Sequence, residues 1–363
     1  MKNVVELSHQ AWREKNYEIA LATWLVLDFQ KSREHRMQDT PMITSVSIDG
    51  IVGHVGSKAA GTKVKLLINN HEIFCTTASQ QRYDVTDHAP NAFRLPSKGI
   101  WRYLGKNDRI EVQDESGNNI PFPSGQLHLE VHLPRESKLK SLLNKLGGDF
   151  MLNKKGSLQP RLHVGSKYAQ DCMNAFFSIH DILLNECDLK LIPTHGTLLG
   201  IVRHEDFIPA DDDIDTAVVS KHSDPDLVKK DMIRVMDVIT HHNFRVEVMV
   251  NGLRIYRNIA GSAKCMGLGT AFRNAEGCFA TSWGRFGVAP RLVWPYEYKP
   301  GKLGPWIIDI PTQSEDILAY CYGESWRFPD PGFSHAKRIV EYKSHQFSPR
   351  EREELNLKYG GKP

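Results

Sequence analysis

A short segment at residues 194–215 carries the residue types that phosphate and metal chemistry needs. It reads THGTLLG, then IVRHEDFIPA, then DDDID. A glycine and a threonine before an apolar helical turn leave backbone N–H groups that can bind an anion. Asp213 and Asp215 open an apolar strand, and because strand side chains alternate, both carboxylates lie on one face. The segment predicts phosphate binding at Gly196 and Thr197 beside a carboxylate pair.

The carboxylate pair predicts a divalent cation. Two carboxylates about 4 Å apart repel by roughly 1 kcal/mol in water and by about 4 kcal/mol at an effective dielectric of about 20. A cation removes that cost, and Mg²⁺ is usually held by one or two carboxylates together with substrate phosphates. We therefore expect Asp213 and Asp215 to bind Mg²⁺ or Mn²⁺.

The elements on both sides of this segment can position it. Before it, five residues at spacings of four and three predict one apolar helix face: Cys172, Phe176, Ile179, Leu183 and Cys187. A short strand at 189–193 then leads into the motif. After it, residues 244–250 and 253–259 predict a hairpin around an Asn-Gly turn.

The chain from 43 to 133 has short alternating runs separated by turn residues, which predicts a β-sandwich. The expected strands are 46–52, 63–68, 72–76, 109–113 and 126–132, with turns at 69–70, 105–108 and 116–119. The strand spacing resembles that of sandwich modules attached to bacterial surface-polysaccharide transferases. That resemblance implies a domain that binds a glycan or a partner enzyme.

Two further regions complete the predicted organisation. Residues 135–167 contain eight Lys and Arg side chains and several glycines, which favours a solvated linker; the alternative is a patch for an anionic polymer or a lipid headgroup. Residues 1–40 resemble one tetratricopeptide-like helical hairpin, which must pack on a neighbour. The expected domains are a hairpin (1–40), a β-sandwich (41–134), a basic linker (135–167) and a catalytic domain (168–363).

Composition narrows the function classes. The 363-residue chain is 40% hydrophobic and 25% charged, and its net charge of +3 is too small to favour general nucleic-acid binding. Six scattered cysteines without a C-x-x-C pair indicate reduced thiols rather than a disulfide framework or a zinc site. Because neither a signal peptide nor a membrane-spanning run is evident, we expect a cytoplasmic protein, with peripheral contact at the inner face of the membrane left open.

Two stretches resemble a known family. HGTLLGIVRH at 195–204 with FIPADDDID at 207–215 is similar to the signature of the LicD and fukutin-related family. WIIDIP at 306–311, followed by ILAYCYG and WRFP, is similar to the closing strand, helix and Tyr-Gly-x-x-Trp tail of that family. The resemblance brackets residues 168–332. It implies a nucleotidyltransferase-like α+β fold that transfers a phospho-alcohol, such as phosphocholine or ribitol phosphate, from a CDP-linked donor to a glycan hydroxyl.

The resemblance also implies roles for single residues. It assigns Gly196 and Thr197 to the donor phosphates, and Asp213 and Asp215 to the metal. Asp211 becomes a further catalytic carboxylate, with a surface acid at a helix end as the alternative.

Three other residues of the motif are assigned less completely. Arg203 and His204 match an Arg-His pair that can neutralise the donor diphosphate, and the alternative is a structural pairing with Glu205 or Asp206. His195 stands where the family usually has an aromatic residue, so base, ligand and spacer all stay open.

The chain departs from the family at the third metal carboxylate. The family carries it on a later strand, and the corresponding region, 277–283, contains no acid. Glu247, Glu276 and Asp309 are the remaining candidates. Cations and two tryptophans populate the region expected to cover the donor, either as donor contacts or as ordinary surface residues: Lys264, Arg273, Arg285, Lys299, Lys302, Trp283 and Trp294.

These observations lead us to expect a metal-dependent transferase of cell-envelope biogenesis. Its acceptor would be a surface polysaccharide or glycolipid such as capsule, lipopolysaccharide or teichoic acid. The N-terminal domains would contact the glycan or other polysaccharide-synthesis enzymes. One alternative is a nucleotide-sugar glycosyltransferase, although the short stretch before the acidic pair leaves little room for a nucleotide-binding half. The other is a glycan-binding family member without catalysis.

Overall fold

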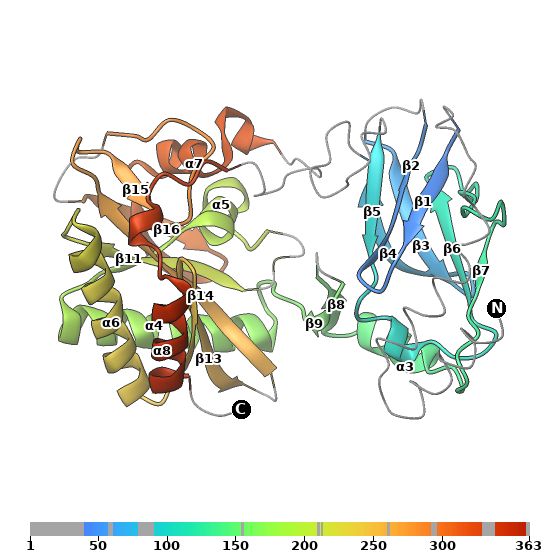
Figure 1. Ribbon diagram of the computed structural model, residues 1–363, viewed down its shortest axis with the longest axis horizontal. Helices are drawn as coiled ribbons and strands as arrows, with labels where there is room; N and C mark the ends of the chain where they lie inside the picture. The colour runs from blue at the N-terminus through green and yellow to red at the C-terminus, as the bar shows by residue number, and fades with distance from the viewer. Residues whose placement is uncertain are drawn as a thin grey trace. The chain divides into compact units, whose positions relative to one another are not determined.

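The computed structural model describes residues 40–56, 61–78, 91–153, 156–208, 211, 213–259, 262–291, 296–328 and 338–360. All of the predicted N-terminal hairpin except its last residue lies outside the described residues. Four other residues named above also lie outside them: Lys154, Lys155, Asp212 and Trp294. The chain divides between Pro160 and Arg161 into two compact units (Figure 1). Helices and several sheets occur in one chain, so the predicted α+β class is confirmed.

The described part of the first unit is built on two main antiparallel sheets, beside a small two-stranded one. One has the order β1-β2-β5, with β1 (Met42–Val46), β2 (Gly50–His54) and β5 (Ala92–Pro96). The other has the order β4-β3-β6-β7, with β3 (Lys63–Ile68), β4 (His71–Thr77), β6 (Arg109–Asp114) and β7 (Leu129–Glu130). Both sheets bury side chains in the same hydrophobic cluster, among them Ile51, Phe93, Leu66, Ile110 and Val112.

Two of the strands expected in this region differ from those observed. The run 46–52 contains the turn between β1 and β2, which the Ser47 N–H closes by donating to the Gly50 carbonyl at 2.9 Å. Apolar alternation continues through this short turn, so periodicity alone does not locate it. Of the run 126–132, only Leu129–Glu130 is a strand. The expected turn at Asn69 and Asn70 is present, with φ of 49° and 66°, as a tight hairpin turn requires.

The segment expected to be a linker, 135–167, contains regular structure instead. It holds α3 (Leu139–Leu146), β8 (Phe150–Leu152) and β9 (Leu158–Pro160), and the last two pair with each other. Leu139, Leu142 and Leu152 are buried in the core of the first unit. The expectation of a solvated linker is therefore corrected: the basic residues dominate the composition here, but the leucine spacing of about one helical turn suffices to bury one face of α3.

The second unit is built around a mixed sheet with the order β10-β11-β14-β13-β12, and β15 also pairs with β14. Its strands are β10 (Leu191–Pro193), β11 (Ile214–Ser220), β12 (Arg245–Met249), β13 (Gly252–Ile259), β14 (Ser262–Arg273) and β15 (Phe279–Thr281). The pairing of β11 with β14 is parallel and the others are antiparallel. The predicted hairpin at the Asn-Gly turn is β12–β13, so that prediction is confirmed.

Helices cover both faces of this sheet. In Figure 1, α5 (His195–His204) and α7 (Ser314–Tyr322) lie on one side, and α4 (Lys167–Cys187) and α6 (Pro225–His241) lie on the other. All five residues of the predicted apolar face of α4 are buried, which confirms that face. The remaining elements among the described residues are β16 (Tyr298–Leu303), β17 (Trp306–Pro311), α8 (Pro349–Tyr359) and three short 3-10 turns, η1 (Trp101–Tyr103), η2 (Glu324–Arg327) and η4 (Lys343–His345).

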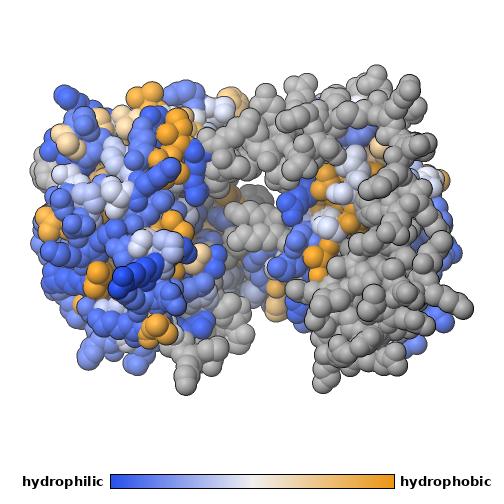
Figure 2. All heavy atoms as spheres, in the orientation of Figure 1, coloured by the Kyte–Doolittle hydropathy of each residue, from blue (hydrophilic) through white to orange (hydrophobic). Residues whose placement is uncertain are grey.

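The face of the second unit that Figure 2 shows is predominantly polar. On the face shown in Figure 2, hydrophilic side chains cover most of this unit, and hydrophobic ones form small separate groups. No helix in the described part of the chain is both long and apolar enough to cross a membrane.

Candidate active site

The start of α5 is bonded to the start of β11. The Thr194 N–H donates to the Asp215 carbonyl at 3.0 Å, and the Gly196 N–H donates to Asp215 Oδ2 at 3.0 Å. In return, the Asp215 N–H donates to Thr197 Oγ1 at 2.8 Å. These three bonds fix the strand-to-helix turn against the strand that carries Asp213 and Asp215.

Three carboxylates gather around two glycines. A Cβ placed on Gly196 would lie 2.5 Å from Asp211 Oδ2 and 3.1 Å from Asp215 Oδ2. A Cβ placed on Gly267, on β14, would lie 3.2 Å from Asp213 Oδ2 and 3.6 Å from Asp215 Oδ1. Asp215 thus lies between the other two acids, and the missing side chains at Gly196 and Gly267 leave the space that the carboxylates occupy.

Among the predicted site residues, the structure brings Gly196 and Thr197 together with the three acids. It differs from the prediction in what Gly196 and Thr197 bind. Gly196 and Thr197, expected to face the donor phosphates, use their N–H and hydroxyl oxygen to hold Asp215. Asp211 is 7% exposed and Asp213 is 5% exposed, so Asp211 is a buried member of the cluster rather than a surface acid.

His195 occupies a strained position at the start of α5. Its φ is 41°, in the left-handed region that residues other than glycine seldom adopt. The ring centroid lies 5.3 Å from that of Trp283 and 6.5 Å from that of Tyr322. Burial, and to a lesser degree the nearby Arg338 guanidinium, lower the pKa of His195 to about 4. His195 is consequently a neutral, packed imidazole near pH 7.

Trp283 closes one side of the site because β14 has no side chain beneath it. A Cβ on Gly269 would overlap the Trp283 indole nitrogen. Gly267 and Gly269 are two residues apart on one strand and so share a face of the sheet. The indole therefore rests on the same face of β14 that borders the carboxylates.

The end of α7 closes another side. Burial, then the Asp215 charge, raises the pKa of Cys321 to about 12. Burial also raises the pKa of Tyr322 well above its usual value, with Asp215 and Asp211 adding to the shift and Arg203 opposing it. Both groups are therefore neutral at physiological pH, and their shifts indicate that Asp211, Asp215 and Arg203 lie close to the end of α7.

Two guanidinium groups flank the aromatic residues. The charge of Arg203, near the end of α5, opposes the rise in the pKa of Tyr322, and the charge of Arg338 helps to lower the pKa of His195. Neither makes an ion pair with another residue in the described part of the chain. The alternative of a structural pairing with Glu205 is not observed, because Glu205 pairs with Lys302 at 2.7 Å. His204 is exposed at the last turn of α5.

Arg338 is a site residue that the sequence did not indicate. It belongs to a short segment that pairs with the residues after Trp283, since Arg285 and Ile339 exchange backbone hydrogen bonds of 2.9 and 2.7 Å. More than 120 positions separate Arg338 from the acidic cluster, and no local motif surrounds it. Only the long-range pairing brings it to the site.

The strand beside Asp215 carries no further acid. The strand that pairs in parallel with β11 is β14, where Asp215 is opposite Gly267. Its sequence, SAKCMGLGTAFR, contains no acid. The region 277–283, expected to correspond, instead forms β15 on β14. Glu247 lies on the far edge strand β12 and accepts a hydrogen bond from the Tyr256 hydroxyl at 2.5 Å.

Asp309 also has a partner elsewhere, and Glu276 is exposed. Asp309 on β17 pairs with Lys190 at 2.6 Å. Of the cations expected to cover the donor, Arg285 pairs with Glu341, and Lys302 is the partner of Glu205.

The acidic cluster suits a cation that takes few protein ligands. Among the described residues, no group of three or more His, Cys, Asp and Glu side chains has the geometry of a complete metal site. Oxygens of two carboxylates lie beside Gly196 and oxygens of two lie beside Gly267, with Asp215 in both pairs. Mg²⁺ commonly takes one or two carboxylates and completes its shell with water and substrate phosphates, so the donor set fits such an ion.

Comparison with known proteins agrees with this site. Residues 189–268 match the model of a family described as LicD/FKTN/FKRP, nucleotidyltransferase domain. The matched segment runs from just before β10 into β14 and includes Gly196, all three acids of the cluster and Gly267. A search of curated proteins found no match to the chain.

Proposed function

Because residues 189–268 make this chain a member of the LicD/FKTN/FKRP family, we propose that its second unit transfers a phospho-alcohol from a CDP-linked donor to a hydroxyl of a cell-surface glycan. The observation that carries the proposal is the gathering of Asp211, Asp213 and Asp215 around two glycines, beside two guanidinium groups. This arrangement offers oxygen ligands for a divalent cation and cationic donors for a diphosphate.

The acidic half of the site would act on the phosphate under attack. Asp213 and Asp215 would hold Mg²⁺ or Mn²⁺, which when bound neutralises charge on the phosphate oxygens. The Gly196 N–H and the Thr197 hydroxyl oxygen orient Asp215 for this role. Any direct contact of Gly196 and Thr197 with the donor would come in addition to this orienting role.

The basic half would hold the donor. Arg203 and Arg338 would bind the diphosphate, since a guanidinium binds phosphate through two parallel N–H groups. The acceptor oxygen would form a bond to the phosphorus that bears the alcohol, the bridging P–O bond would break, and CMP would leave. We assign the proton of the acceptor hydroxyl to Asp211, because the His195 ring is packed against Trp283 and Tyr322. Most of the acceleration would come from positioning and electrostatics.

A glycan-binding family member without catalysis is the second candidate. It is favoured by one observation, the lack of any carboxylate on β14 next to the acidic pair. A glycosyltransferase is less well supported, because in the described residues of the second unit only α4 and β10 precede the motif, which leaves no room for a separate nucleotide-binding half.

A thermal-shift screen separates the three candidates. The transferase predicts stabilisation by CDP-alcohols that requires Mg²⁺, with little effect of UDP- or GDP-sugars. The glycosyltransferase predicts the reverse preference. The non-catalytic protein predicts no metal-dependent nucleotide effect at all, and that result would exclude the transferase.

A further inference from the structure

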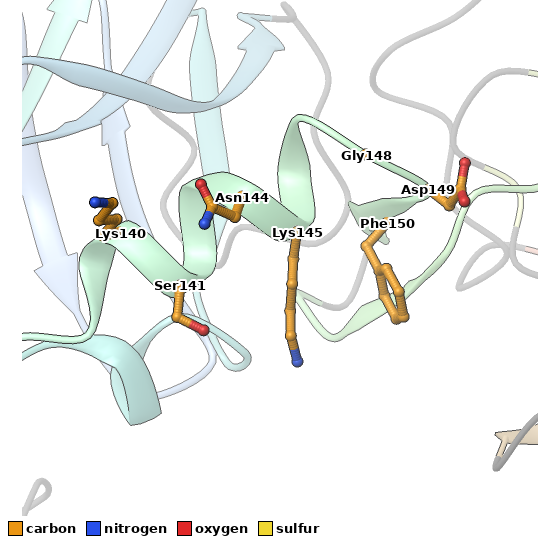
Figure 3. A pocket seen from close by; sticks show the side chains of 7 residues that line it. All are labelled: Lys140, Ser141, Asn144, Lys145, Gly148, Asp149 and Phe150. Atoms are coloured by element: carbon orange, nitrogen blue, oxygen red, sulfur yellow. The ribbon is translucent and has the colours of Figure 1, made fainter.

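The basic segment that the transferase site does not use contributes to a pocket in the first unit. This pocket has a volume of about 570 Å³, within the range of roughly 300–1,000 Å³ that is common for small-ligand sites. It lies along α3 and the residues that lead into β8 (Figure 3). Its side chains are those of Lys140, Ser141, Asn144, Lys145, Asp149 and Phe150.

Lys145 is held in place at this pocket by aromatic residues. Its Nζ donates to the Tyr103 hydroxyl at 3.2 Å and lies 5.6 Å from the centroid of that ring. It also lies 5.7 Å from the centroid of Phe150. In Figure 3 the side chains of Lys145 and Phe150 extend to the same side of the ribbon. The pocket thus combines a positioned ammonium group with a half-buried aromatic ring.

The other polar side chains of the pocket are available to a ligand. Lys140, Ser141 and Asn144 are exposed, and their side chains make no hydrogen bond or ion pair with the rest of the described chain. Ser141 and Asn144 are three residues apart and Lys140 and Asn144 four, so each pair consists of neighbours on the surface of α3. They offer a hydroxyl, an amide and a second ammonium group.

We propose that this pocket binds an anionic saccharide, meaning a glycan segment that bears carboxylate or phosphate groups. Each of the two ammonium groups would bind an anionic group of the saccharide, the amide and hydroxyl would bind sugar hydroxyls, and the Phe150 ring would pack on the apolar face of a sugar ring. Asp149 would accept from a sugar hydroxyl. The site belongs to the first unit, so its ligand binding does not depend on the transferase proposal.

A membrane surface fits the same charges less well. Binding at a lipid interface needs apolar side chains that can enter the headgroup region beside the basic ones. Leu139 and Leu142 of α3 are buried in the core, and Phe150 is the one hydrophobic side chain of the pocket. A saccharide, which presents hydroxyls as well as charge, uses the polar groups that a lipid surface would leave without partners.

Calorimetric titration of the full chain tests this proposal at physiological salt. The probes are a hyaluronan tetrasaccharide, neutral maltotetraose, inorganic phosphate and phosphatidylglycerol vesicles. We expect the hyaluronan tetrasaccharide to bind most tightly, and Lys140→Gln to weaken that binding about ten-fold, equivalent to about 1.4 kcal/mol. Asn144→Ala should weaken it less, by roughly three-fold, because it removes a neutral hydrogen bond.

Lys138→Gln is the matched control, since it removes the same charge from the same segment but Lys138 does not line the pocket. It should leave the affinity within about two-fold. Equal losses in Lys138→Gln and Lys140→Gln would overturn the proposal, as would equal binding of maltotetraose or of inorganic phosphate. Binding of the vesicles without binding of the tetrasaccharide would overturn it in favour of a membrane contact.

Discussion

The backbone N–H of Gly196, in the first turn of α5, donates to Oδ2 of Asp215, near the start of β11, at 3.0 Å. This bond ties the apolar helix start to the acidic strand. It also means that the conformation of residues 194–197 sets the position of Asp215, whether or not these residues contact a substrate.

The first prediction concerns Gly196. In Gly196→Ala the added methyl group would stand 2.5 Å from Asp211 Oδ2, so one carboxylate or the helix start must move. We expect loss of most Mn²⁺ binding, with a stability cost of about 1–3 kcal/mol. Calorimetry and chemical denaturation measure the two effects. In the control Gly147→Ala the new methyl group meets only the Leu143 and Asn144 carbonyls, at 3.3 and 4.0 Å, and should change neither.

The second prediction concerns Thr197. Thr197→Val keeps the side-chain shape but removes the acceptor of the Asp215 N–H. A buried N–H without a partner costs about 1–3 kcal/mol, so this variant should be destabilised by that amount. Thr197→Ser keeps the oxygen and should lie within about 0.5 kcal/mol of the parent. Equal stability of the valine and serine variants in urea denaturation would show that the hydrogen bond contributes nothing.

The third prediction concerns pH. The pKa of His195 falls from 6.5 in the unfolded chain to about 4 in the folded protein. The folded state therefore binds fewer protons in this window, so the stability contributed by the neutral imidazole is complete above pH 6.5 and is lost as the pH falls towards 4. The loss amounts to about 3 kcal/mol.

His195→Phe tests this assignment. The phenyl ring retains the packing against Trp283 and Tyr322 but cannot titrate. The variant should lose much less stability than the parent between pH 6.5 and 4.5 in urea denaturation. His345, whose pKa burial also lowers, stays in both proteins and supplies the residual slope. An unchanged slope in His195→Phe would assign the acid sensitivity to other groups.

The fourth prediction concerns the two arginines. Arg203→Ala and Arg338→Ala should each weaken CDP binding in the presence of Mg²⁺ by ten-fold or more, about 1.4 kcal/mol, because each removes a charge-assisted contact to the diphosphate. Lys302→Ala is the matched control, since Lys302 pairs with Glu205 on the surface. A loss in Lys302→Ala as large as in the arginine variants would indicate a general effect of charge rather than two specific contacts.

Local patterns predicted the parts of the fold that depend on local spacing. The apolar face of α4, the β12–β13 hairpin at Asn251 and Gly252, and the turn at Asn69 and Asn70 all follow from periodicity or turn chemistry. The helix α3 was not predicted, because its two buried leucines, Leu139 and Leu142, are a weak signal within a segment rich in basic and polar residues.

Contacts between residues far apart in the sequence could not be predicted from local patterns. The sequence indicated Gly196 and Asp215 separately, but their hydrogen bond depends on β10 and β11 pairing antiparallel. Likewise Gly267 became part of the site only through the parallel register of β11 and β14, and Arg338 only through its bridge to the segment after Trp283. Strand register across a sheet is set by the packing of the whole unit, not by neighbouring residues.

The central claim is that Asp213 and Asp215 hold the cation needed to bind a CDP-linked donor. Calorimetry of the parent and of Asp213→Asn with CDP, with and without Mn²⁺, tests it most directly, because Asp213 does not take the Gly196 bond on which the turn depends. We predict CDP binding that requires Mn²⁺ in the parent and is lost in Asp213→Asn, with both proteins folded by circular dichroism. Binding of CDP that is independent of the metal, or that is equal in the two proteins, would contradict the claim.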